Sequence, residues 1–144
     1  MIALDELRSS WGWAFPAQID AILDSNRFGN LLVVCQESIY RIVVEDSAVV
    51  RLCPEGQYGD LWQDAGFVKD WTCERWLASF ASARGDIPDG HVISFIVPAI
   101  LGGQYSPENW RTTPLSEYVQ CYGDIARQIS LLPDGAKVQI KVSP

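Results

Sequence analysis

The chain has 144 residues and a mass of 16.1 kDa, the size of one ordinary globular domain. Hydrophobic residues make up 48% of it, with six Trp, five Tyr and five Phe, which excludes intrinsic disorder, a collagen-like fibre and a bare coiled coil. The 11 Lys and Arg against 18 Asp and Glu leave a formal net charge of -7, so we expect no direct binding to nucleic acid, whereas a basic protein partner is compatible.

The first 25 residues have the pattern of a helical segment. Apolar residues recur on one side of a helix at its start: Ile2, Leu4, Leu7 and Trp11. Pro16 suits the first turn of a second short helix, which is predicted over residues 17–24. Turn-forming residues at 25–30 then separate this segment from the rest of the chain.

Three runs rich in Val and Ile follow, at residues 31–36, 39–45 and 48–53. Because short loops join them, they predict an antiparallel meander. Arg41 and Arg51 alternate with apolar neighbours, as expected for a sheet with one face in water.

The hydrophobic period changes to that of a helix between residues 55 and 84. The apolar positions with helical spacing are Cys73, Trp76, Leu77, Phe80 and Ala81. Asp70 or Thr72 is the expected cap at the start of this helix. A weaker, separate helical turn is predicted from Leu61, Ala65 and Val68, and residues 85–90 form a loop.

Residues 92–97 are almost wholly apolar and end at Pro98, which predicts a central strand buried on both faces. Residues 99–112 are then expected to form a structured loop. Gly102 and Gly103 are expected to adopt backbone angles denied to other residues, so that the loop leaves the strand tightly.

The longest helical pattern begins with Thr113 as the expected N-cap and Pro114 in the first turn. Its apolar positions are Leu115, Tyr118, Val119, Tyr122, Ile125, Ala126, Ile129 and Leu132. Gly123 costs this helix about 1 kcal/mol relative to Ala. We therefore expect either another backbone close to Gly123 or relief of crowding beside Tyr122 and Trp110.

The helix is expected to stop at Pro133 and Gly135, before a last strand over residues 137–142. These elements together predict one domain over residues 1–144, of class α+β, with helices packed on a mostly antiparallel sheet.

No motif in the sequence points to a catalytic, metal or cofactor site. The single histidine, His91, has no ligand-spaced His, Cys or acid near it, and a structural role is expected. The chain has no G-x-S-x-G elbow, and Gly102 and Gly103 belong to no phosphate-binding glycine motif. We therefore expect a binding protein, not an enzyme, that carries no cofactor.

Acidic and aromatic residues alternate over residues 58–74. In a helix, Asp60 with Asp64 and Asp70 with Glu74 would form carboxylate pairs, although such pairs arise by chance among 18 acids. Aromatic anchors beside charges are typical of tight protein interfaces. The candidate partner-binding residues are Tyr58, Asp60, Trp62, Asp64, Asp70 and Glu74. The alternative is that Trp62 belongs to the core and the acids are only solvated.

The cysteines are widely spaced within apolar segments and form no CxxC pair: Cys35, Cys53, Cys73 and Cys121. They are interpreted as buried free thiols, which favours a reducing compartment. Residues 1–8 lack the pattern of a signal peptide, and no apolar stretch approaches the roughly 18 residues that span a bilayer. We expect a cytoplasmic protein without a membrane span.

Several short stretches together resemble one protein family. They are Phe28-Gly-Asn-Leu-Leu32, Ile39-Tyr-Arg-Ile42, Ser94-Phe-Ile-Val-Pro-Ala-Ile-Leu-Gly-Gly-Gln-Tyr105 with Glu108-Asn109, Gly123-Asp-Ile-Ala-Arg-Gln-Ile129 and Leu132-Pro-Asp-Gly135. The family is the type VI secretion immunity proteins that inhibit secreted bacterial DNase toxins, which often carry a GAD-like N-terminal region. The resemblance covers residues 26–142. The residues carried over as fold determinants are Pro98, Gly102, Gly103, Asn109, Gly123, Pro133 and Gly135.

The resemblance implies a cytoplasmic antitoxin that binds a cognate nuclease and blocks its active site or substrate groove. Charge supports this expectation independently, because a DNase presents a positive cleft and a partner of charge -7 suits it. Two alternatives stay open. A small hydrolase with an unrecognised carboxylate site predicts a polar cleft that holds an acid of perturbed pKa. A general bacterial interaction module predicts binding without protection from a toxin. Oligomeric state is open.

Overall fold

The computed structural model describes residues 1–133 as an α+β fold. The helices are α1 (Leu4–Trp11), α2 (Tyr58–Leu61), α3 (Ala65–Thr72), α4 (Glu74–Arg84) and α5 (Leu115–Ser130). The strands are β1 (Ala21–Ser25), β2 (Leu31–Cys35), β3 (Ser38–Val43), β4 (Ala48–Pro54), β5 (His91–Phe95) and β6 (Trp110–Pro114). Strands β1 to β4 form an antiparallel sheet in chain order, and β5 pairs with β6 in a second sheet. The predicted fold class is confirmed.

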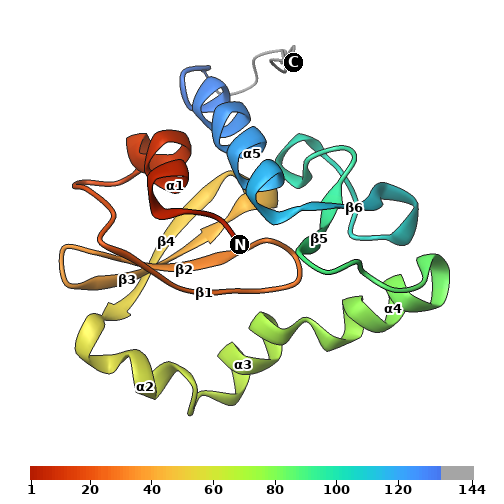
Figure 1. Cartoon of the computed structure of the whole chain (residues 1–144), viewed down its shortest axis with the longest axis horizontal. Helices are drawn as coiled ribbons and strands as arrows, with labels where there is room; N and C mark the ends of the chain where they lie inside the picture. Colours follow the sequence, from red (N-terminus) through yellow and green to blue (C-terminus); the bar gives the residue numbers. More distant parts are fainter. Residues whose placement is uncertain (134–144) are drawn as a thin grey trace.

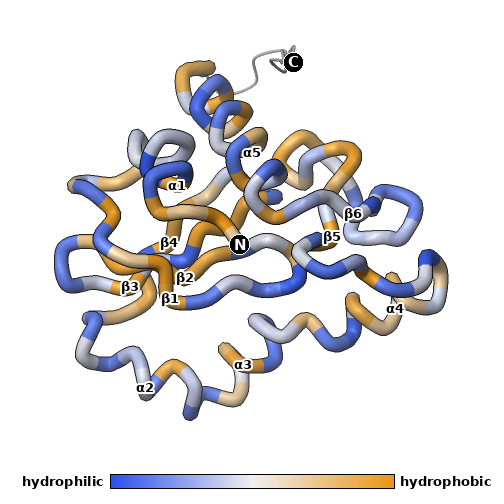
Figure 2. The backbone as a smooth tube through the Cα atoms, in the orientation of Figure 1, coloured by the Kyte–Doolittle hydropathy of each residue, from blue (hydrophilic) through white to orange (hydrophobic). Residues whose placement is uncertain are grey.

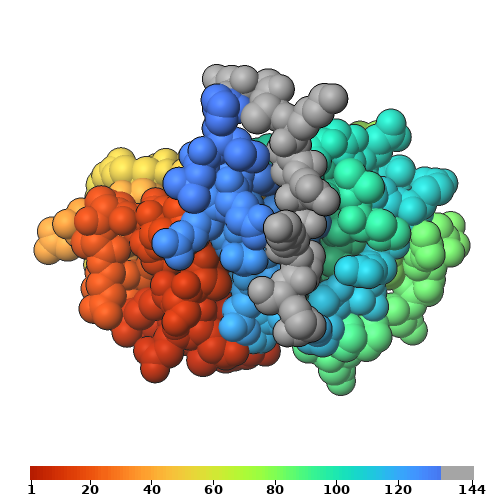
Figure 3. Space-filling model, turned by 90° about the horizontal axis from the view of Figure 1, so that it is seen from above, coloured from red at the N-terminus to blue at the C-terminus, as the bar shows by residue number. Residues whose placement is uncertain are grey.

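Helices cover both faces of the four-stranded sheet (Figure 1). Helices α1 and α5 lie on one face, α2 and α3 lie along the other, and α4 continues from α3 to lie beside β5 and β6. Seen from above, α5 lies against α1 (Figure 3), where Trp11 Nε1 donates a hydrogen bond to Val119 O over 2.8 Å. Hydrophobic residues run along the strands (Figure 2), and the largest core cluster joins the sheet to α1 and α5.

The N-terminal segment contains one of the two predicted helices. Helix α1 is confirmed, with Leu7 and Trp11 fully buried. The second predicted helix is wrong, because residues 21–25 form β1 and pair with β2 from Ala21 opposite Val34 to Ser25 opposite Leu31. Pairing supplies the hydrogen bonds that the outer edge of β2 needs, and this outweighs the weak helical pattern.

The predicted meander is confirmed as β2, β3 and β4. The expectation of one wet face is wrong for its centre, since β2 is buried at all five positions and α3 lies over Arg41. Arg51 on the edge strand β4 is exposed, as expected. A second helical layer, rather than water, therefore covers the polar side of the sheet.

Helices α2, α3 and α4 lie where the sequence indicates helices, but the predicted cap of α4 is wrong. Asp70 and Thr72 are part of α3, and α4 begins after Cys73, whose φ of 53° lies in the left-handed region. The cap in this layer is Asp64, which accepts a hydrogen bond from Phe67 N over 3.1 Å at the start of α3.

Strand β5 is buried as predicted, but it is not a central strand. Within the described residues it pairs on one side with β6, which begins inside the predicted loop. Phe95 is buried against the aromatic side chains of a second core cluster, whereas Ile96 and Val97 lie past the end of the strand and are exposed. Contacts with these side chains, rather than a third strand, exclude water from β5.

Helix α5 is confirmed as the longest helix of the described chain, although it begins one residue later than predicted. Thr113 belongs to β6, where it lies opposite Val92, so Pro114 takes the N-cap position. Leu132 follows the end of the helix and is exposed. Gly135 and the predicted strand over residues 137–142 lie outside the described residues.

Gly123 packs α5 against α1. A Cβ atom at this position would lie 2.5 Å from Ser10 O and 2.9 Å from Trp11 Nε1. Of the two explanations that the sequence leaves open, the close approach of another backbone is the one seen here.

No helix of residues 1–133 is long and apolar enough to cross a membrane. The cysteines are free thiols, of which Cys35 and Cys53 are buried and Cys73 and Cys121 are half-buried. The prediction that all four cysteines are buried is therefore confirmed for Cys35 and Cys53 and is wrong for the other two.

Candidate functional site

A pocket of about 660 Å³ lies between the four-stranded sheet and the layer of α3 and α4. Its walls come from the turn before β2, from β3, from a 3-10 turn over Val44–Asp46, from α3 and α4, and from Tyr105. We call it the central pocket. Its lining combines aromatic rings with charged groups of both signs, which sets it apart from the apolar core clusters.

Glu45 lines the pocket and is only 4% exposed. Asn30 Nδ2 donates a hydrogen bond to Glu45 Oε2 over 2.7 Å, and Tyr105 OH donates one to Oε1 over 3.1 Å. Burial raises the pKa of the Glu45 carboxyl, although the hydrogen bonds from Asn30 and Tyr105 oppose this rise. Among residues 1–133 Glu45 forms no ion pair, so neutral donors alone stabilise its charge.

Arg41 connects the sheet to α3 at the same pocket. Its Nε donates a hydrogen bond to Asn30 Oδ1 over 3.1 Å, and its Nη1 forms an ion pair with Asp70 Oδ2. The guanidinium also lies 5.1 Å from the centre of the Trp71 ring, within cation–π range. Asn30 therefore bridges Arg41 and Glu45, and these residues with Tyr105 and Asp70 form what we call the Glu45 network.

A tight turn before β2 places Asn30 in the network. Asn26 Oδ1 accepts hydrogen bonds from Phe28 N over 3.0 Å and from Asn30 N over 2.9 Å. Gly29 has a φ of 76°, and a Cβ atom there would lie 2.8 Å from the ring of Tyr118. The turn thus fixes the direction in which the buried Asn30 side chain enters the pocket.

The loop after β5 places Tyr105. Asn109 accepts a hydrogen bond from Val97 N over 2.8 Å and donates hydrogen bonds to Val97 O and to Gln104 O, each over 3.0 Å. Gly102 has the expected positive φ, at 93°, whereas this expectation is wrong for Gly103, where a Cβ atom would instead overlap Val97 O. These contacts close the loop on itself and bring Tyr105 to Glu45.

All six predicted partner-binding residues lie in the layer of α2, α3 and α4 or at its helix ends (Figure 1). The acids among them are exposed: Asp60, Asp64, Asp70 and Glu74. They do not form the proposed pairs on shared helix faces, because α2 ends before Asp64 and α3 ends before Glu74. Asp70 and Glu74 line the central pocket, and Asp60 and Asp64 do not.

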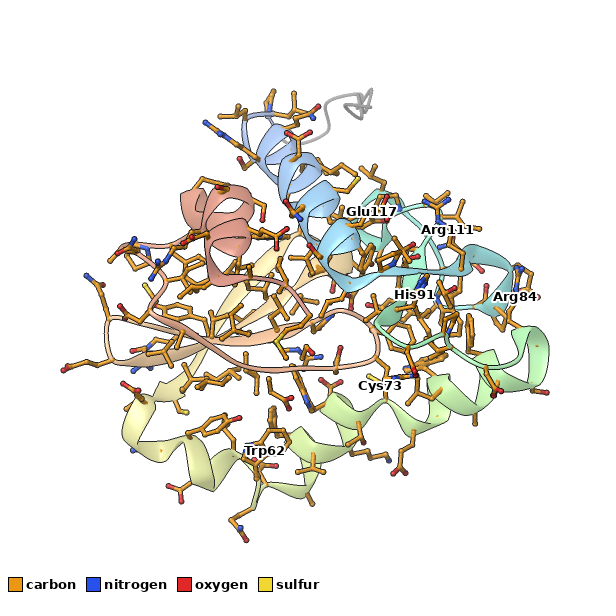
Figure 4. The ribbon with its side chains drawn as sticks, in the orientation of Figure 1. Trp62, Cys73, Arg84, His91, Arg111 and Glu117 are labelled. Atoms are coloured by element: carbon orange, nitrogen blue, oxygen red, sulfur yellow. The ribbon has the colours of Figure 1, made fainter. Side chains whose placement is uncertain are left out.

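Tyr58 and Trp62 are half-buried in a cluster of aromatic rings. The Trp62 ring centre lies 6.1 Å from that of Tyr58, 5.4 Å from Phe67 and 6.5 Å from Trp71. Figure 4 labels Trp62 at the turn between α2 and α3, and Cys73 where α3 meets α4. Trp62 therefore packs against other rings of its own layer and keeps part of its surface in water, and it belongs to none of the three core clusters of the described residues.

Sequence reasoning missed most of the Glu45 network. Asn30, Arg41 and Tyr105 all lie in the stretches that carry the family resemblance, and this was the available signal. Glu45 gives no such signal, because it is one of two adjacent acids at the end of a β-like run, outside these stretches. Its contact with Tyr105 joins residues 60 positions apart, so no motif spacing reports it.

His91 opens β5, and its Nδ1 atom is buried without a hydrogen-bond partner. The described part of the chain contains no group of three His, Cys, Asp or Glu residues that could hold a metal ion. The sequence matches no protein-family model and no curated protein.

Proposed function

We propose that this chain is an immunity protein that acts in the cytoplasm, where it binds a cognate type VI secretion effector and neutralises it. The effector is a nuclease, and binding blocks its active site or substrate groove. One observation carries the proposal: stretches of the sequence that resemble the immunity family converge on the central pocket. Asn30, Arg41 and Tyr105 come from three such stretches, and all line this pocket beside Glu45.

The charge of the molecule supports a basic partner. A nuclease needs a positive cleft for phosphates, and the net charge of this chain is -7. Four exposed carboxylates lie in the α2–α4 layer, at Asp60, Asp64, Asp70 and Glu74. Complementary charge accelerates association, which matters when a few toxin molecules enter a cell. These residues stay our candidates for contacts with the toxin.

A protection assay tests the proposal. The product of the adjacent gene is expressed in a sensitive bacterium with and without this protein, survivors are counted, and the two proteins are purified together. We expect survival and a stoichiometric complex. A toxic neighbour that this protein neither binds nor neutralises would contradict the proposed pairing. Binding without protection would instead support a general interaction module.

The central pocket also favours a second candidate, a small hydrolase that uses Glu45. The pocket is lined by charged groups as well as aromatic rings and holds an acid whose pKa burial raises, a combination compatible with such an enzyme. Both Glu45 oxygens already accept hydrogen bonds, so catalysis would require Asn30 or Tyr105 to release one of them. Turnover of nitrophenyl glycosides or esters that Glu45→Gln abolishes would favour the hydrolase, and no turnover by the wild type would count against it.

A further inference from the structure

The Glu45 carboxylate lies at the boundary of the central pocket with hydrogen-bond donors but no counter-ion. Asn30 and Tyr105 both donate to it, so both oxygens act as acceptors, as in an ionised carboxylate. Arg41 is the nearby cation of the network, but its hydrogen bond and ion pair go to Asn30 and Asp70. Residues 1–133 therefore leave Glu45 without a paired positive charge.

Aromatic rings form the walls beside this carboxylate. Trp76 and Tyr105 lie 5.7 Å apart between ring centres, and both line the pocket together with Phe28. The guanidinium of Arg75 lies 5.3 Å from the ring centre of Trp76, so this ring already contacts a cation on one side. A carboxylate beside aromatic faces is the environment that binds an ammonium or guanidinium group.

Of the other charges that line the pocket, the mostly buried Arg41 is paired with Asp70, and the rest lie exposed at its rim with both signs. Lys69 and Arg75 are exposed, and so are Asp46 and Glu74. Water and salt screen these exposed charges, whereas the field of the buried Glu45 is screened much less. The interior of the pocket therefore favours a positive group, although its rim carries both signs.

We infer that the central pocket receives one basic side chain, Arg or Lys, from a protein partner, with Glu45 as its counter-ion and Trp76 and Tyr105 as its aromatic walls. The inference rests on the proposed function for the source of this side chain, since the surface of a nuclease is rich in such residues where it binds phosphates. The pocket volume of about 660 Å³ is ample for one side chain. Insertion of this basic side chain would give Glu45 the positive counter-ion that residues 1–133 do not provide.

Nuclear magnetic resonance titration of the full chain tests the inference without the partner. The probes are N-acetyl-arginine methylamide, its neutral citrulline analogue and inorganic phosphate, and the reporters are the Asn30 side-chain amide and the Trp76 indole. We expect saturable shifts with the arginine probe and none with the citrulline probe. Glu45→Gln should weaken arginine binding about tenfold, and the exposed control Glu55→Gln should not change it.

A second variant keeps the test decisive if Glu45→Gln fails to fold. Trp76→Leu keeps an apolar side chain at a half-buried position but removes the aromatic face, so it should also weaken arginine binding. Equal shifts with the arginine and citrulline probes, or saturation by phosphate alone, would overturn the inference. Protection from a toxin without arginine binding would support the proposed function and overturn the inference about the pocket. Arginine binding without protection would support the inference about the pocket and contradict the proposed function.

Discussion

At the scale of single residues, Glu45 shows how a charged side chain is retained inside the fold. Burial of a carboxylate is costly unless donors reach it, and Asn30 and Tyr105 are those donors. The Asn26 turn positions one donor, and the loop closed by Asn109 positions the other. The turn and the loop thus meet at one carboxylate, which links the local structure to the proposed binding site.

Glu45→Ala should lower the free energy of unfolding by about 1–3 kcal/mol, because it leaves buried donors on Asn30 and Tyr105 without an acceptor. The measurement is urea denaturation at neutral pH. Glu74→Ala serves as the control, since this exposed side chain should change stability by less than about 0.5 kcal/mol. Equal losses for the two variants would show that the Glu45 hydrogen bonds contribute little.

The stability difference between the wild type and Glu45→Gln should depend on pH. Burial raises the pKa of Glu45 above its ordinary value of 4.5, so the native state keeps this proton to higher pH than the unfolded chain does. The free energy of unfolding of the wild type, relative to the variant, should therefore fall as pH rises from 4.5 through the raised pKa. Denaturation at a series of pH values measures it, and a difference that rises with pH would contradict the direction of the shift.

At the scale of elements, α1 and α5 are held together by a contact that only glycine permits. Gly123 lets the backbone of α5 approach Ser10 O, and Trp11 Nε1 reaches Val119 O beside it. Glu6 reinforces the same pair by accepting hydrogen bonds from Ser116 and Gln120. The backbone hydrogen bond from Ala3, followed by these two, lowers the pKa of Glu6. The close packing of α1 against α5 therefore outweighs the low helix propensity of glycine at this position.

Gly123→Ala should destabilise the protein by about 1–3 kcal/mol, although alanine favours a helix, because its Cβ would lie 2.5 Å from Ser10 O. Gly59→Ala in α2 is the matched control. Apart from its chain neighbours and the backbone of its own helix, no atom lies within 4 Å of the added Cβ, so this change should be neutral or stabilise by up to about 1 kcal/mol. Thermal and urea denaturation compare the two, and a stable Gly123→Ala variant would mean that α1 shifts easily.

At the scale of the whole molecule, the α2–α4 layer is attached to the sheet by apolar contacts at its two ends and polar ones between them. Tyr58 and Leu61 pack on one core cluster, and Trp76 and Leu77 pack on another. Between these ends, Arg41 pairs with an acid of α3 beside the central pocket. This arrangement presents exposed acids on the outside and leaves the central pocket between the layer and the sheet.

Removal of negative charge from this layer should slow association with the cognate toxin. Asp60→Lys with Asp64→Asn keeps a capping oxygen on α3 and should lower the association rate roughly 3–10-fold at low salt, with little change in melting temperature. Glu117→Lys with Asp124→Asn makes the same charge change on α5, on the opposite side of the sheet. Stopped-flow mixing at low and high salt measures both, and equal slowing would place the contact elsewhere.

The sequence by itself determined the elements whose signals are local. The periodicity of α5, the apolar side of α1 and the Val- and Ile-rich runs of the meander each lie within one stretch of chain, so hydrophobic spacing was sufficient to predict them. The acidic charge and the α+β class followed from the same information. The weak signals at residues 17–24 and 99–112 failed, because β1 and β6 exist only through pairing with another strand.

Only the tertiary structure decided the site. Glu45, Asn30 and Tyr105 come from a 3-10 turn, the start of a strand and a long loop, and no periodicity relates them. The burial of Arg41 likewise depends on α3, which the chain forms many residues later. A hydrogen-bond network between distant segments depends on where the packed layers bring them, and that position results from the whole core rather than from any one stretch of sequence.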